Sequence, residues 1–221
     1  MDLKIYQKNL GDYAYNKIKL LILKDVLKNG EKIVQEKMAQ KLGISKIPII
    51  QALSVLQNER LIEYYPRRGF FVRELSYKEF SDILDIRRAL ESLAIKKIIH
   101  NLNDSIKYKL IEFLKDFELY SKIKNHKKYF ELDKKFHYYL IEASDNSYLI
   151  DINNAFNILL LCYTKGFRTK IEVSVEHHRK IIDAILNRES EKAMNLIKEH
   201  TEHKKESHLL DEYQDKSKKP K

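Results

Sequence analysis

The 221-residue chain contains one cysteine, three prolines and five glycines. The lone cysteine, Cys162, excludes a disulfide within the chain, as is usual for proteins of a reducing compartment. So few glycines and prolines argue against an all-β or a disordered chain. No apolar run approaches the roughly 18 residues of a membrane span, and the first residues lack the apolar core of a signal peptide. We therefore expect a cytoplasmic, mostly helical protein that does not enter the membrane.

Positive charge is concentrated in the first third of the chain. Residues 1–73 contain 14 Lys and Arg against 7 Asp and Glu, whereas residues 74–221 contain 28 against 25. A basic segment of this kind is expected where a protein binds phosphate groups. An ordinary solvated surface explains the excess equally well, so other features of the sequence must distinguish the two.

Residues 1–75 combine a helical period of apolar residues with a later hairpin pattern. Gly43 supplies the backbone freedom for a sharp turn between two helices, and Ser45 is suited to cap the second of them. The expected elements are helices over residues 13–27 and 35–42, a further helix after Ser45, and strands over residues 61–65 and 70–72. In this order they predict a winged helix-turn-helix domain, with a purely structural hairpin as the alternative.

The second helix of a helix-turn-helix enters the major groove of DNA with its first residues nearest the bases, and a wing contacts the backbone or the minor groove. Glutamine can pair with adenine, and isoleucine can contact the methyl group of thymine. Arginine at a wing tip suits the negative potential of a narrow A·T-rich minor groove. We therefore expect the chain to bind double-stranded DNA at an A·T-rich operator. The candidate DNA-binding residues are Ser45, Lys46, Ile47 and Gln51 on the helix, and Arg67, Arg68 and Gly69 on the wing.

In this ordered succession the motifs resemble the DNA-binding module of the GntR-type bacterial transcription regulators. The resemblance covers about residues 10–73. The matching residues are Asn29-Gly30, Met38-Ala39, Leu42-Gly43-Ile44-Ser45, Pro48, Ala52-Leu53, Leu56, Leu61-Ile62 and Pro66-Arg67-Arg68-Gly69-Phe70-Phe71-Val72. The resemblance implies a homodimer, and two-fold symmetry implies a palindromic operator.

The recognition helix departs from the family pattern at its reading face. Lys46 and Ile47 stand where the family has arginine and threonine, and Ile50-Gln51 replaces an Arg-Glu pair. The loss of two arginines predicts a lower affinity and a changed sequence preference. Alternatively, the isoleucines of this helix, Ile49 included, pack against protein, and specific DNA binding is lost.

Residues 76–210 show helical periods only, and they predict an all-helical domain. The first helix begins at a capping-box pattern, Ser76-Tyr77-Lys78-Glu79. The expected helices cover residues 77–99, 104–123, 126–143, 147–168, 174–187 and 190–208. The residues expected to face inward in the first of them are Ile83, Ile86, Leu90, Leu93 and Ala94. We expect residues 211–221 to form a disordered basic tail.

Four side chains of this domain combine into a candidate metal site. Asp133 and His137 lie four residues apart and share one helix face. They can hydrogen-bond to each other or bind a metal together, and these two residues alone favour the simple pair. His178 and His200 are in register with apolar positions of two later helices, so both imidazoles are expected to face the core. One carboxylate and three imidazoles suit Zn, Ni, Fe, Co or Mn, with positions left open for water or a ligand oxygen.

The same region resembles the FCD type of effector domain, which is attached to many GntR regulators. The matching residues are Arg87 with Leu90-Glu91, Asp133 with His137, Ala143 with Asn146 and Leu149, His178, and Ala193 with His200. The resemblance implies a bundle of six or seven helices with a central metal and, beside the metal, a pocket for a small carboxylate effector. His177 is the rival of His178, and His203 lies about one turn after His200.

Two residues are candidates for binding the effector. Arg87 can clamp a carboxylate, or it can serve only as the ion-pair partner of Glu91. Asn146 belongs to a matched pattern of the family. Weaker candidates for lining a pocket are Tyr138, Tyr163 and Arg168.

These features predict a one-component transcription regulator whose helical domain senses a small organic acid at or beside a divalent metal. We expect no enzyme activity, because no general base, nucleophile elbow or phosphate-binding loop accompanies the candidate metal ligands. The alternatives are a metal-dependent hydrolase, a bundle in which the metal is only structural, and a nonspecific nucleic-acid binder.

Overall fold

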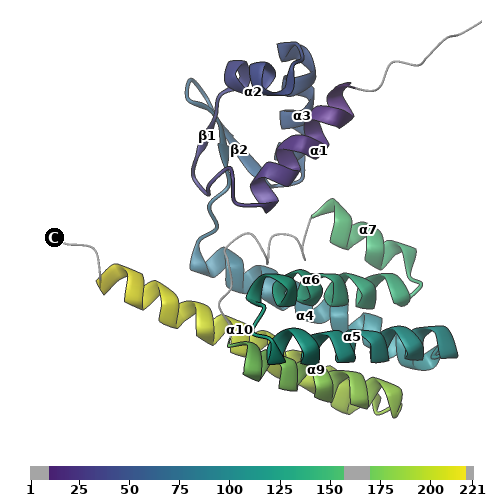
Figure 1. Ribbon diagram of the computed structural model, residues 1–221. Helices are drawn as coiled ribbons and strands as arrows, with labels where there is room; N and C mark the ends of the chain where they lie inside the picture. Colours follow the sequence, from purple (N-terminus) through teal and green to yellow (C-terminus); the bar gives the residue numbers. More distant parts are fainter. Residues whose placement is uncertain (1–9, 157–169, 218–221) are drawn as a thin grey trace, which may run out of the picture. The chain divides into compact units, whose positions relative to one another are not determined.

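The computed structural model describes residues 10–156 and 170–217, with side chains as far as Lys205 in the last helix (Figure 1). The chain divides into two compact units, Met1–Leu75 and Ser76–Lys221. Within the described residues the first unit combines helices with a small sheet, and the second contains helices alone. None of these helices has the length and apolar character that a membrane span needs. The architecture is mostly α, with a winged helix-turn-helix ahead of a helical bundle, which confirms the predicted fold class.

The N-terminal unit is a winged helix-turn-helix. Its elements are α1 (Leu10–Leu23), β1 (Lys32–Ile33), α2 (Gln35–Leu42), α3 (Lys46–Asn58), β2 (Ile62–Tyr65) and β3 (Gly69–Val72). The strands form an antiparallel sheet in the order β1-β3-β2, so β3 is the central strand (Figure 1). Helix α1 packs against α3 through an apolar face that includes Ile18, Ile49 and Leu53. This packing holds α3, the helix expected to read DNA, in place.

Two turns of this unit use left-handed backbone. Gly43 ends α2 with φ 67°. In the hairpin between β2 and β3, Arg67 has φ 62° and Gly69 has φ 92°. Glycine adopts this conformation without a steric penalty, whereas arginine does so uncommonly. The hairpin therefore turns tightly at Arg67 and Arg68, which lie between its two strands.

Two local predictions for this unit are wrong, and one short strand was not predicted. Helix α1 covers Leu10–Leu23 instead of residues 13–27, and the φ of 54° at Asp25 is incompatible with a continuing helix. Ser45 occupies the N-cap position of α3, but its side chain makes no capping hydrogen bond. Strand β1 is missing from the prediction because two residues carry no strand pattern, and the strand exists only through its pairing with β3.

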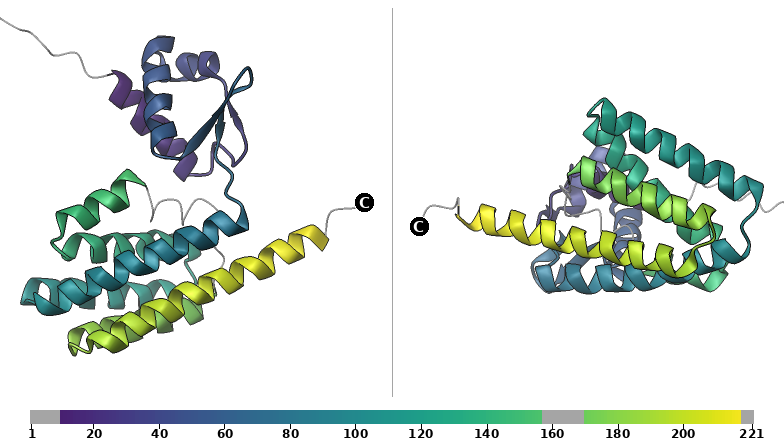
Figure 2. Two further views of the ribbon diagram at one scale, coloured as in Figure 1. Left: turned by 180° about the vertical axis from the view of Figure 1, so that it is seen from behind. Right: turned by 90° about the horizontal axis from the view of Figure 1, so that it is seen from below.

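The C-terminal unit is a helical bundle. Its elements are α4 (Tyr77–His100), α5 (Asp104–Lys122), α6 (His126–Ala143), α7 (Ser147–Ala155), α9 (Ile171–Leu186) and α10 (Ser190–Ser217), which makes six helices in the described part of this unit. Helix α4 runs along α10, and α5 lies against both α6 and α9 (Figure 2). Their shared core includes Phe113, Phe117, Phe136, Ile181 and Ile197. Buried aromatic rings thus fill the interior of the bundle, where the candidate metal ligands also lie.

Helix starts in this unit follow capping side chains. The predicted capping box is present at α4: the Glu79 N–H donates to Ser76 Oγ at 3.2 Å, and the Ser76 N–H donates to Glu79 Oε2 at 2.9 Å. Asn103, Asn125 and Asn146 accept backbone N–H groups at the starts of α5, α6 and α7. These contacts satisfy donors that a helix leaves without partners in its first turn.

The inward face of α4 differs from the prediction. Ile86 and Leu93 are 46% and 42% exposed, whereas Arg87 and Glu91 are buried. Arg87 and Glu91 form an ion pair, which lets two charged residues occupy the inner face. A prediction from apolar periodicity assumes that charged residues face the solvent. It therefore assigns the wrong side of α4 to the core at these positions.

Two helix ends also differ from the prediction. Helix α7 ends at Ala155. The remainder of the predicted helix over residues 147–168 lies outside the described residues, together with Cys162, Tyr163 and Arg168. Helix α10 continues to Ser217, so residues 211–217 are helical where the composition predicts a disordered tail. This segment has no glycine or proline before Pro220, and its Glu, Gln and Lys residues are good helix formers.

Candidate functional site

The bundle brings four potential metal ligands from three helices to one point. Asp133 and His137 come from α6, His178 from α9 and His200 from α10. Each of these residues is at most 3% exposed. One ligand atom from each lies within 4.8 Å of those of the other three. Ligand atoms bind zinc at about 2.0–2.3 Å, so small side-chain shifts would bring these four atoms within bonding distance of one ion.

Aromatic packing and two polar contacts orient His178. Its ring stacks on Phe117 with 4.1 Å between the centroids. Its Nδ1 lies 3.2 Å from the Tyr129 hydroxyl, and its Nε2 lies 3.1 Å from Asp133 Oδ1, although the second contact is not aligned as a hydrogen bond. The Tyr129 hydroxyl can donate to Nδ1 or accept from it. His178 Nε2 can therefore serve as a donor to Asp133 or as a metal ligand, according to the tautomer.

A buried ion pair on α4 stands behind His137. Arg87 Nε donates to Glu91 Oε1 at 2.8 Å, and the two side chains are 2% and 0% exposed. The same Glu91 oxygen lies 2.9 Å from His137 Nδ1, although the contact is not aligned as a hydrogen bond. Burial alone would raise the pKa of Glu91, but Arg87 and His137 lower it to about 2. An ionised carboxylate behind the ring is a common outer partner of a metal-bound histidine.

His200 is the least satisfied polar side chain of the group. It is 1% exposed, and in the described part of the chain neither of its ring nitrogens has a hydrogen-bond partner. Its ring centroid lies 5.2 Å from that of His137 and 4.8 Å from that of His178. A buried polar group without a partner costs about 1–3 kcal/mol. A metal bond to one nitrogen would remove much of this cost, so the side chains present fit a divalent ion.

Burial and charge keep the ligands in the state that metal binding requires. Burial lowers the pKa of His178 to about 4 and holds that of His200 well below its ordinary value. Burial alone would raise the pKa of Asp133, but Lys204 and His137 outweigh it and hold this pKa well below its usual range. Near pH 7 these two imidazoles are therefore neutral and the carboxylate is ionised, as ligation requires.

Two further members of the group escape the sequence patterns. Lys204 lies on α10, is 3% exposed, and places its Nζ 3.2 Å from Asp133 Oδ2 and 3.5 Å from Oδ1. Burial lowers the pKa of Lys204 to about 8. The second is Tyr129 of α6, whose hydroxyl contacts His178 Nδ1. Helical spacing places both on the face of the group, because Lys204 follows His200 by four residues and Tyr129 precedes Asp133 by four, but spacing alone does not show that either side chain is buried.

The two neighbouring histidines lie beside the group and not within it. His177 is half-buried, and its ring centroid lies 5.6 Å from those of His200 and His203. The group of close ligand atoms among the described residues contains His178 and neither His177 nor His203. One residue step turns a helix by about 100°, which is why only one of two adjacent histidines faces Asp133.

The two predicted effector-binding residues already have partners. Arg87 is paired with Glu91. Asn146 accepts the Leu149 N–H at 3.2 Å through its Oδ1 and so caps α7. Tyr138 lines a hollow of about 440 Å³ between α5 and α6, and the lining of this hollow includes none of the four metal-ligand candidates.

In the first unit, α3 exposes most of the residues expected to read DNA. Its exposed residues near the start are Ser45, Lys46, Ile47, Ile50 and Gln51. Ile47 and Ile50 are 68% and 40% exposed, whereas Ile49 is fully buried. Ile49 therefore packs against protein, whereas Ile47 and Ile50 remain accessible to DNA. The Lys46 ammonium is paired with Glu36 of α2, an exposed contact that DNA phosphates can replace.

The wing holds one of its arginines against aromatic rings. The Arg68 guanidinium lies 5.5 Å from the ring centre of Tyr65 and 5.3 Å from that of Phe71. Cation–π contacts of this kind hold an exposed arginine in place without neutralising it. Arg67 is exposed, and Gly69 begins β3.

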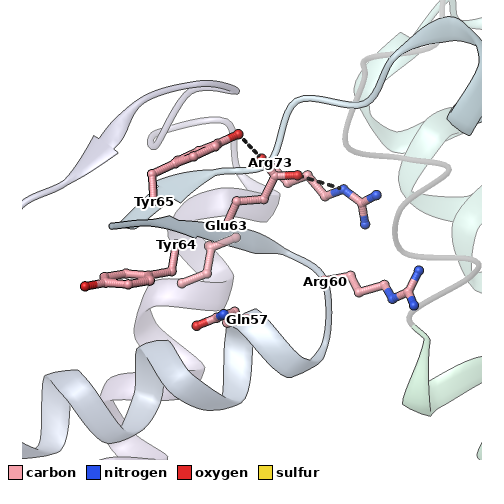
Figure 3. A pocket seen from close by; sticks show the side chains of 7 residues that line it. Gln57, Arg60, Glu63, Tyr64, Tyr65 and Arg73 are labelled. Carbon is pink, nitrogen blue, oxygen red and sulfur yellow. Dashed lines mark hydrogen bonds and ion pairs between the residues drawn. The ribbon is translucent and has the colours of Figure 1, made fainter. Parts of the chain in front are cut away.

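A shallow hollow lies on the face of the sheet, next to the end of α3 (Figure 3). Glu63 is the one carboxylate among its lining residues. It accepts the Tyr65 hydroxyl at 2.5 Å and lies 3.5 Å from Arg73 Nε. A metal needs several ligands, and the one carboxylate that lines this hollow is already shared by Tyr65 and Arg73. The hollow is therefore not a candidate metal site.

The two units together define a DNA-binding transcription regulator with a helical effector-type domain. The family model of the bacterial regulatory proteins of the gntR family matches residues 10–72, and the FCD domain model matches residues 82–203. The chain belongs to the GntR family of bacterial transcription regulators and carries an FCD domain.

Two relatives are also transcription regulators, and a solved structure shares the fold. The HTH-type transcriptional regulator YdhC of Bacillus subtilis is 29% identical over 208 residues, which are 90% of this chain and 91% of the relative. The gluconate operon transcriptional repressor of Bacillus licheniformis is 23% identical over 167 residues, or 75% of this chain and 68% of the relative. McbR/YncC of E. coli shares the fold, with a TM-score of 0.75 at 19% identity, covering 92% of this chain and 98% of its own. These relatives are named as transcription regulators.

Proposed function

We propose that Asp133, His137, His178 and His200 bind one divalent transition metal, and that a small organic acid at or beside this metal controls DNA binding. The observation that carries the proposal is the convergence of four buried ligand atoms within 4.8 Å of one another. Zn, Ni, Fe, Co and Mn all suit this donor set, and availability in the cell decides among them. When bound, such an ion supplies an electrophilic centre that attracts an anionic oxygen.

The surrounding residues prepare this centre. Glu91 faces Nδ1 of His137, and the Tyr129 hydroxyl faces Nδ1 of His178. Each partner leaves the opposite ring nitrogen, Nε2, directed at Asp133. Partners of this type fix the tautomer and the orientation of a metal-binding histidine. The aromatic packing around His178 keeps water out and strengthens the attraction between an ion and an acid.

The acid is proposed to act by changing the populations of two arrangements of the protein. It can do so only if it binds one arrangement better than the other. We retain Arg87 and Asn146 as candidates for contacting its carboxylate. A relative is named for the gluconate operon, which makes sugar acids and other small carboxylates a rational first set of ligands.

The DNA-binding unit is proposed to act as a homodimer on a palindromic, A·T-rich site. Lys46 and Gln51 would read bases in the major groove, and Arg67 and Arg68 would contact phosphates or the minor groove. Two-fold symmetry of the protein matches two half-sites. Sedimentation of the full chain at micromolar concentration tests this part, and a monomer in the presence of metal would contradict it.

A thermal-shift screen of small organic acids on metal-loaded protein tests the sensor proposal. We expect at least one acid to raise the melting temperature of the wild type and to leave the Asp133→Ala variant unchanged. Asp183→Ala, which removes an exposed aspartate of α9, is the matched control and should respond like the wild type. If every acid that stabilises the wild type also stabilises Asp133→Ala, the acid does not bind at this centre.

A further inference from the structure

The buried charges of the described residues form two neutral pairs around the candidate metal centre. Apart from histidines, the buried charged side chains of the described part are Arg87, Glu91, Asp133 and Lys204. Arg87 pairs with Glu91 at 2.8 Å, and Lys204 pairs with Asp133 at 3.2 Å. The two positive and two negative charges cancel, so these four buried side chains have no net charge when no ion is bound.

A divalent ion upsets this balance. It adds two positive charges to a site whose ligands are at most 3% exposed, where uncompensated charge is costly. Of the two buried carboxylates, Glu91 is held by Arg87, and only Asp133 belongs to the ligand group. Asp133 must then serve both the ion and Lys204. The loaded site therefore carries two positive charges more than its own acidic groups neutralise.

The two oxygens of Asp133 face different partners, which lets the Lys204 contact persist beside an ion. Oδ1 lies 3.1 Å from Nε2 of His178 and 3.7 Å from Nε2 of His137. Oδ2 lies 3.2 Å from Nζ of Lys204, and Nζ is 3.5 Å from Oδ1. An ion bonded to Oδ1 at about 2.1 Å would thus lie no more than roughly 6 Å from the ammonium. A small acid bound to that ion has Lys204 within reach of a second anionic group.

We propose that Lys204 is a binding residue for the effector and makes the site selective for small dianions. The ion takes one anionic group of the acid, and Lys204 takes the other. A dianion returns the buried site to neutrality, whereas a monoanion leaves one positive charge without a partner. This inference rests on the proposed function and goes further by naming the charge of the effector. It also requires the metal and the dianion to strengthen each other's binding, because each removes the charge that opposes the other.

Calorimetric titration of the full chain, loaded with Ni²⁺ and freed of excess metal, tests the proposal with malonate, acetate and inorganic phosphate. We expect malonate to bind the wild type at least tenfold more tightly than acetate. Lys204→Met should reduce this preference at least fivefold and, without any acid, should bind Ni²⁺ more tightly than the wild type. Lys205→Met is the matched control, because Lys205 pairs with Asp85 instead of the ligand group, and it should keep the wild-type preference. Phosphate distinguishes a general dianion site from one shaped for two carboxylates.

Three results would overturn the proposal. The first is equal binding of malonate and acetate by the wild type, and the second is an unchanged preference in Lys204→Met. The third needs no variant: Ni²⁺ affinity of the wild type that is the same with and without malonate excludes the coupling, even if Lys204→Met fails to fold. Failure of the proposed function looks different, because the wild type would then not retain stoichiometric Ni²⁺ at all.

Discussion

Nε2 of His178 and Oδ1 of Asp133 lie 3.1 Å apart, although the two residues belong to helices α9 and α6. Without an ion, the two atoms are close but not aligned as a hydrogen bond, so His178 Nε2 has no hydrogen-bond partner among the described residues. With an ion, both atoms can turn to the metal, and the Tyr129 hydroxyl can accept a hydrogen bond from the N–H that His178 then has at Nδ1. Because the candidate ligands come from three helices, binding of a metal by them would be linked to the packing of the bundle.

Removal of the metal is expected to destabilise the bundle. An ion that binds only the folded state stabilises it by about 2.7 kcal/mol at a free concentration 100 times its Kd. A chelator should therefore lower the melting temperature of Ni²⁺-loaded wild type by several degrees, as measured by scanning calorimetry. His200→Ala should melt at one temperature with or without chelator, and the exposed His126→Ala should respond like the wild type. Identical melting of loaded and chelated wild type would count against the metal site.

Acid should destabilise the metal-free protein. The pKa of His178 is about 4 in the folded state and about 6.5 in an ordinary environment, so the unfolded chain binds more protons between these values. Its contribution to stability is therefore complete above pH 6.5 and falls as the pH drops toward 4, by up to roughly 3 kcal/mol. His200 acts in the same direction. Urea unfolding at pH 7 and pH 4.5 measures the loss, which should be smaller in His178→Gln; an equal loss in that variant would show that other groups cause it.

Loss of the carboxylate behind His137 should weaken metal binding. Glu91→Gln removes the charge that lies 2.9 Å from His137 Nδ1 while keeping the size of the side chain. Outer partners of metal-bound histidines typically contribute 10–100-fold in affinity, and we expect a reduction of that order. Glu131→Gln, an exposed change on α6, is the control. Competition with a chromophoric chelator gives both affinities, and circular dichroism shows whether the variant is folded. Unchanged affinity in folded Glu91→Gln would exclude this role.

The wing and the recognition helix should contribute to DNA binding in different ways. Arg67→Ala is expected to weaken binding similarly for all sequences and to reduce the salt dependence by about one counterion. Gln51→Ala is expected to relax base preference at one position of each half-site, at a cost of about 1–3 kcal/mol for the preferred site. Fluorescence anisotropy on selected operators at two salt concentrations measures both effects, with the exposed Lys96→Ala as control. Selection of G·C-rich half-sites by the wild type would contradict the expected preference.

Much of the fold follows from local signals in the sequence. The capping box at Ser76 and Glu79, the left-handed Gly43 and the hairpin ending at Gly69 each act through neighbouring residues, so their patterns survive in the sequence. Strand β1 could not be predicted, because its two residues are ordered only by pairing with Phe70 and Phe71 of β3. Elements that depend on neighbouring residues can therefore be predicted from the sequence, whereas an element that depends on a distant partner cannot.

The candidate site likewise contains residues that the sequence predicts and residues that only the structure places there. Asp133, His137, His178 and His200 can be grouped because polar residues in apolar registers are conspicuous. Lys204 is not conspicuous, because this lysine-rich chain offers many similar residues and only the packing of α10 shows that it is buried. The burial of Arg87 and Glu91 likewise depends on their mutual pairing, which rotates α4 away from the apolar face that periodicity suggests.

A crystal structure of the metal-loaded protein, with anomalous data collected at the absorption edge of the metal, shows directly whether these four side chains bind an ion. We expect one strong anomalous peak bonded to an Asp133 oxygen and to Nε2 of His137 and His178, with His200 completing the set. A peak elsewhere on the chain, or stoichiometric metal that leaves these four side chains unbonded, would contradict the proposed metal site.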